Sequence, residues 1–163
     1  MKMSTNLEEA FNKQINHELY SGYLYLSMAA YLESQNFTGM ATWMRKQFEE
    51  EQMHAMKLLD YVQSRGNKVV LSAIAKPKTT WESPVDIFEE SLKHEQLVTK
   101  LINSLYVLST KENDAAAQVL LQWFVNEQVE EESSVEGIIH KLNMIGPSGN
   151  GLLMLDYELA KRV

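Results

Sequence analysis

Residues 45–59 read RKQFEEEQMHAMKLL, and the rest of the chain can be interpreted around this stretch. Read as a helix, it belongs to an apolar stripe with steps near 3.6 residues, formed by Met44, Phe48, Ala55, Leu58 and Val62. Glu51 falls in the middle of that stripe, and His54 stands one turn further along the same face. Because a carboxylate inside a helix bundle is costly unless its charge is compensated, the pair suggests a metal ion.

Length and composition favour one all-α domain. The chain has 163 residues, of which 45% are hydrophobic, and it contains only 7 glycines and 3 prolines. This length can bury one substantial core, and helix-forming residue types dominate. We therefore expect residues 1–163 to form a single domain.

The charge balance excludes several classes of partner. The formal net charge is −7, which is unfavourable for binding nucleic acid or an anionic membrane and favourable for attracting cations. The absence of cysteine rules out disulfides and thiolate metal sites and fits a cytoplasmic protein. The N-terminus lacks an apolar signal core, and no stretch reaches the roughly 18 apolar residues of a membrane span.

Start and stop signals predict four long helices and a short one. Residues 5–8 resemble a capping box, and Thr38 is expected to cap the second helix. The first helix's predicted stripe is Phe11, Ile15, Leu19, Gly22, Leu26 and Ala29. The predicted helices cover about residues 5–35, 38–65, 84–112, 114–146 and 151–162. The last has no partner in a four-helix core, so we expect it to pack between subunits.

A long connection separates the second and third helices. Residues 67–82 include β-branched residues and a proline and show no helical period. At about 3.3 Å per extended residue, this segment can cross the full length of a bundle. The third helix is therefore expected to start at the same end as the second, as in a bundle with one long crossover.

All four long helices interrupt their apolar stripe at mid-length with residue types that bind metals. A single interruption has an ordinary explanation, such as an error in the assumed helix phase. Four at matching depth would meet in one layer of the bundle, where unpaired carboxylates repel one another and lose solvation. Oxygen-rich ligation with one imidazole favours iron or manganese over structural zinc or calcium. The interrupting residues are Glu18, Glu51, His54, Glu95, Gln128 and Glu131.

The sequence resembles the haem-free ferritins of bacteria and archaea over nearly its whole length. The resemblance lies in residues 16–25, 50–54, 93–97, 123–132 and 149–152. It implies a ferritin-like four-helix bundle with a short fifth helix. Ferritin-like di-iron proteins carry one glutamate on each of two helices and Glu-x-x-His on the other two. Here the fourth helix departs from that pattern with Gln128-x-x-Glu131, which implies a weaker second iron site.

The resemblance also implies a role for each site residue. Glu18, Glu51 and His54 would hold the first iron, and Glu51, Glu95 and Glu131 the second, with Gln128 nearby. Three further glutamates resemble a third iron site, although alone they read as a solvated acidic face: Glu50, Glu127 and Glu130. Tyr25 resembles the family's tyrosine beside the centre, although periodicity alone makes it a core residue. Because Gln52 occupies the position of a haem-binding methionine, we expect no haem.

The function that this resemblance implies is iron storage with ferroxidase activity. Two Fe(II) ions per subunit would be oxidised by dioxygen or peroxide, and Fe(III) would be stored as mineral in a hollow homo-oligomeric shell of twenty-four subunits. Two alternatives stay open. One is a di-iron or manganese oxidase or peroxidase, although the chain shows no extra domain or electron-transfer cysteines. The other is a twelve-subunit DNA-protecting relative, although the chain has no basic tail. Besides these two, a plain structural bundle without metal is a third alternative.

Overall fold

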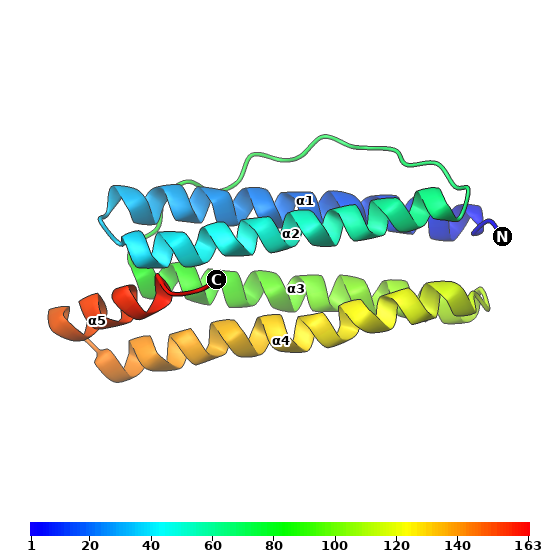
Figure 1. The fold of residues 1–163 in the computed structure, drawn as a ribbon. Coiled ribbons are helices and arrows are strands. Elements are labelled where there is room, and N and C mark those ends of the chain that lie inside the picture. The colour runs from blue at the N-terminus through cyan, green and yellow to red at the C-terminus, as the bar shows by residue number, and fades with distance from the viewer.

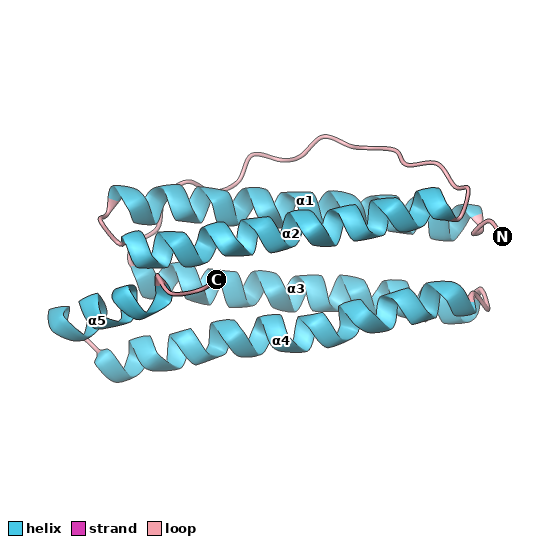
Figure 2. Cartoon of the chain, in the orientation of Figure 1, coloured by secondary structure: helices cyan, strands magenta, loops and turns pink.

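The protein is an all-α four-helix bundle with a short fifth helix. The computed structural model describes residues 1–163, and Figure 2 shows helices and loops without strands. The sequence prediction of the fold class is therefore confirmed. None of the five helices combines the length and apolar character needed to cross a bilayer. The helices are α1 (Thr5–Ser34), α2 (Thr38–Ser64), α3 (Pro84–Lys111), α4 (Ala115–Ile145) and α5 (Gly149–Leu159).

The connections fix the directions of the long helices (Figure 1). Tight turns make α1 antiparallel to α2 and α3 antiparallel to α4, whereas the crossover returns the chain along the bundle. As expected, α3 therefore begins at the end where α2 begins. Side chains of α1 hold the crossover in place: Asn12 donates to the Lys68 carbonyl at 2.9 Å and accepts from the Val70 amide at 2.7 Å.

The apolar core is divided into two clusters by a polar layer at mid-length. One cluster holds 17 buried residues from the end where α5 packs, and the other holds 12 from the opposite end. In α1, for example, one cluster ends at Ile15 and the other begins at Leu24. Corresponding gaps occur in the other three long helices. Buried polar residues occupy these gaps, which include Glu18, Glu51, Glu95, Gln128 and Glu131.

Three details differ from the sequence prediction. Helix α1 is capped by Ser4, whose hydroxyl accepts from the Leu7 amide, because Thr5 already lies inside the helix. Leu26 is 36% exposed, since the α1 stripe shifts to Leu24, Tyr25 and Met28 beyond the polar layer. Thr38 does not cap α2, whose N-cap is Phe37 and makes no side-chain cap bond.

The cap of α2 comes instead from α5, which has a partner within its own bundle. The buried Asp156 carboxylate accepts from the Gly39 and Met40 amides at 3.2 and 2.8 Å. A negative charge at a helix N-terminus is stabilising. A Cβ on Gly39 would lie 1.7 Å from the Asp156 carbonyl oxygen, so this contact requires glycine. Leu155 and Leu159 of α5 join the core, which corrects the expectation of a helix without an internal partner.

We predict that Gly39→Ala lowers the free energy of unfolding by about 1–3 kcal/mol, because the new methyl group would overlap the α5 backbone at the start of α2. Gly137→Ala is the matched control, since a Cβ there meets no atom within 4 Å and alanine favours helix by up to about 1 kcal/mol. Thermal and denaturant unfolding of both variants checks this. A Gly39→Ala protein as stable as Gly137→Ala would contradict the proposed contact.

Candidate metal centre

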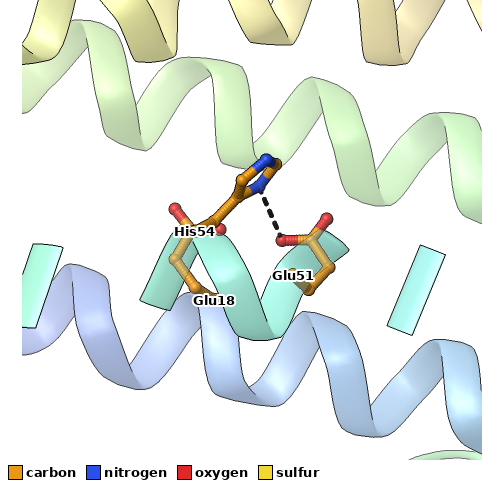
Figure 3. A group of neighbouring side chains, drawn as sticks. All are labelled: Glu18, Glu51 and His54. Atoms are coloured by element: carbon orange, nitrogen blue, oxygen red, sulfur yellow. Dashed lines mark hydrogen bonds and ion pairs between the residues drawn. The ribbon is translucent and has the colours of Figure 1, made fainter. Parts of the chain in front are cut away.

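Three ligand-type side chains from α1 and α2 converge in the polar layer. Glu18, Glu51 and His54 each offer a ligand atom, and these atoms lie within 4.8 Å of one another. Figure 3 shows Glu18 reaching across from α1 toward the α2 pair, in which His54 Nδ1 lies 3.3 Å from Glu51 Oε2. The exposed fractions of these residues are 1%, 1% and 5%, so water cannot compensate their charges.

One oxygen of Glu18 is available to bind a cation. Its Oε1 accepts from the Gln14 amide at 2.8 Å, but its Oε2 is buried with no hydrogen-bond partner. A buried polar atom without a partner costs free energy, so it is expected to have a function. A divalent ion between Glu18, Glu51 and His54 would satisfy this oxygen, and the donor set of two carboxylates and one imidazole suits iron.

Two further glutamates from α3 and α4 complete the layer. Glu95 accepts from the Gln128 amide at 3.1 Å on Oε2 and from the Tyr25 hydroxyl on Oε1. Glu131 accepts from the Gln47 amide at 2.7 Å. All six residues that were predicted to interrupt the apolar stripes are buried: Glu18, Glu51, His54, Glu95, Gln128 and Glu131. In this metal-free arrangement Gln128 donates to Glu95, so it orients a carboxylate.

Burial and mutual repulsion make these carboxyls weak acids when no metal is bound. Burial raises the pKa of Glu95 to about 7, although hydrogen bonds from Tyr25 and Gln128 oppose the shift. Burial and the Glu95 charge raise the pKa of Glu131 to about 8. The pKa of Glu51 is raised well above its ordinary value by burial and by its glutamate neighbours. The centre therefore holds protons that a divalent cation would displace.

The three glutamates predicted for a third site lie outside this dry layer. Glu50 and Glu127 are half-buried, and Glu130 is exposed. Glu50 forms an ion pair of 2.5 Å with Arg162, near the C-terminus. The structure thus supports a distinction between a buried centre and a wetter acidic face beside it.

The sequence analysis missed the side chains that hold the ligands. Gln14 and Gln47 are 3% and 0% exposed, and each precedes a layer glutamate of its own helix by four residues. This spacing places both side chains on one helix face. A glutamine four residues before a predicted ligand was therefore a usable sequence signal. Trp123 was also missed: its ring packs edge-on against His54, with centroids 5.5 Å apart.

The bundle and this layer together define a class of protein, the four-helix bundles with carboxylate-rich metal centres. A family model described as a ferritin-like domain matches residues 8–145. The chain is 39% identical over 160 residues to a bacterial non-heme ferritin of Bacteroides fragilis, covering 98% of this chain and 99% of that protein. One from Staphylococcus aureus is 37% identical, with 98% and 96% covered.

Solved structures agree with these relatives. A novel open pore ferritin from the hyperthermophilic archaeon Archaeoglobus fulgidus has a TM-score of 0.99 and 48% identity, covering 99% of this chain and 100% of that one. An engineered closed form of the same ferritin gives a TM-score of 0.98. The chain belongs to the ferritin family.

The raised pKa values predict that the metal-free protein loses stability as pH rises. A carboxyl whose pKa is higher in the folded state stabilises the fold while protonated. This contribution is complete below the ordinary pKa and is lost as pH rises through about 7 for Glu95 and about 8 for Glu131. We expect the melting temperature without metal to fall by at least about 5 °C between pH 6 and pH 8.5.

Two variants test the cause of this loss. Glu131→Gln should reduce the fall, because it removes one buried titrating group, whereas Glu136→Gln removes an exposed carboxylate of the same helix and should not. A saturating divalent cation should restore stability at pH 8.5 in the unaltered protein. An equal fall in all three proteins would show that the buried layer is not its source.

Proposed function

We propose that the polar layer is the ferroxidase centre of an iron-storage protein, with two iron ions bound per subunit. The convergence of Glu18, Glu51 and His54 around an unpartnered buried oxygen carries this proposal. Iron is here the substrate and the cargo. Membership of the ferritin family supports the same reading.

Each side chain has a definite role in this proposal. Glu18 and His54 hold the first Fe(II), Glu51 bridges the two ions, and Glu95 and Glu131 hold the second. Two Fe(II) ions release two electrons, which reduce one dioxygen to the level of peroxide while both ions become Fe(III). Gln14, Gln47 and Gln128 keep the carboxylates oriented, as their amide hydrogen bonds indicate.

Proton release accompanies iron binding. Glu95 and Glu131 carry protons near neutral pH when no metal is present, because their pKa values are raised to about 7 and about 8. Binding of Fe(II) displaces these protons, since carboxylates bind metals in their ionised form. Tyr25 lies against Glu95, so it is placed to influence that carboxylate when charge builds up at the second ion.

A third iron ion would bind at Glu50, Glu127 and Glu130, beside the centre. Their partial exposure favours a weaker site than the buried pair. The absence of haem stays a prediction based on Gln52. Location in the cytoplasm and a shell of twenty-four copies, with Fe(III) mineral inside, also stay predictions.

The ferroxidase proposal predicts that Glu51→Ala abolishes rapid oxidation, because the bridging carboxylate contacts both ions. After anaerobic addition of Fe(II) and exposure to air, we expect the initial rate of Fe(III) formation, followed by absorbance, to fall by about 100-fold. Glu49→Gln is the matched control, since Glu49 is an exposed carboxylate two residues away. Unchanged oxidation in Glu51→Ala, or an equal loss in Glu49→Gln, would count against the centre.

The storage proposal predicts a large hollow assembly. Twenty-four copies of the 18.7 kDa chain amount to roughly 450 kDa, and twelve copies to roughly 220 kDa. Light scattering after size-exclusion chromatography separates these masses, and electron microscopy after iron loading should show spheres with dense cores. A monomer or dimer would favour the di-iron enzyme, and a twelve-subunit particle would favour the DNA-protecting relative.

A further inference from the structure

The C-terminal segment brings a guanidinium group to the edge of the metal centre. After α5 ends, Arg162 reaches α2, where its Nη2 donates to Glu50 Oε2 at 2.5 Å and its Nη1 to the Trp43 carbonyl at 3.4 Å. The guanidinium carbon also lies 4.3 Å from the centroid of the Trp43 ring. The Arg162 side chain is 21% exposed. Arg162 is therefore held at a fixed position by three contacts.

This position depends on the docking of α5. Asp156 anchors that helix to the first amide groups of α2, and Gly39 lets the two backbones approach closely. Leu159, three residues before Arg162, is 7% exposed and packs in the core. The chain leaving α5 is therefore directed toward the segment of α2 that contains Glu50 and Glu51.

The guanidinium pairs with a carboxylate that lies next to the centre in the sequence of α2. Glu50 precedes the bridging residue Glu51 and is one of the three glutamates proposed for the third iron ion. Arg162 thus already neutralises Glu50 as a permanent cation.

We propose that Arg162 sets the affinity of the third cation site by competing with the cation for Glu50. A third ion must displace the guanidinium from Glu50 Oε2 before this carboxylate can bind it. The third ion is therefore held more weakly than the buried pair and is free to move on. This inference rests on the proposed function, because it assigns Glu50, Glu127 and Glu130 to a cation.

A purely structural role for Arg162 makes the opposite prediction. If its hydrogen bond only kept Glu50 in a geometry suitable for binding, removing it would weaken the third site. If Arg162 competes with the cation, removing Arg162 raises the affinity of the third site instead. The direction of the change in affinity therefore distinguishes competition from support.

The test is calorimetric titration of the assembled, iron-free protein with Zn²⁺, a divalent probe without redox chemistry. We expect Arg162→Gln to tighten the weakest class of sites about three- to fivefold, as a partly exposed ion pair permits. The two tighter sites should keep their affinity. The gain should shrink as salt concentration rises, because screening weakens the competing charge.

Matched variants isolate the cause. Arg162→Lys keeps the charge and should stay near the original affinity. Lys161→Gln removes an equal charge from an exposed neighbour that lies over the Tyr157 ring, and it should change nothing. Glu50→Gln should remove the weakest class, and adding Arg162→Gln to it should have no further effect. Size-exclusion chromatography and thermal unfolding confirm that each variant assembles and folds.

Several results would overturn the inference. These are weaker or unchanged binding in Arg162→Gln, an equal gain in Lys161→Gln, and absence of a third class in both the unaltered protein and Arg162→Gln. Failure of the proposed function looks different. In that case the two tight sites are themselves absent, or they persist in Glu51→Ala.

Discussion

Buried carboxylates that cannot all ionise without a cation are the constraint on which this structure depends. Glu18, Glu51, Glu95 and Glu131 lie in one layer between two apolar clusters, and none has access to enough water to compensate its charge. Without metal, the layer relies on bound protons and glutamine amides, and one oxygen of Glu18 has no partner. In the proposed centre, the same oxygens are the metal ligands. The instability of the metal-free layer and its affinity for cations therefore have one physical origin.

The fold supplies what such a layer requires. Long helices give each ligand a rigid backbone, and the crossover between α2 and α3 lets four helices contribute at one depth. The two apolar clusters on either side exclude water and stabilise the bundle, which offsets the cost of the polar layer. Division of the core thus separates two roles: the apolar ends of the bundle hold it together, and its middle carries the residues of the proposed metal centre.

The features that could be predicted from the sequence are those that produce a regular spacing of residues along a helix. Glu51 and Glu95 were found because each interrupts an apolar stripe, and the fold class followed from the same stripes and from the long crossover. Periodicity cannot reveal contacts between segments far apart in the chain. Asp156 accepts from the Gly39 amide of α2 across 117 residues, and Arg162 pairs with Glu50 across 112 residues. Gln47 lies four residues before Glu51, so helical spacing could have indicated it, but it does not interrupt an apolar stripe with a metal-binding residue type.

In the proposed arrangement, an incoming cation competes with protons at the buried centre and with the Arg162 guanidinium at the third site. This difference explains why neighbouring cation sites can differ in affinity. In the dry layer, an incoming ion displaces protons from Glu95 and Glu131, whose pKa values near 7 and 8 make this exchange easy at neutral pH. Beside it, an incoming ion must displace a guanidinium, which does not lose its charge at any physiological pH. Glu50 is also partly hydrated, so a cation gains less there from leaving bulk water. In the proposed function, a buried pair of strong sites beside a weaker, partly exposed site would give oxidised iron a direction in which to leave the centre.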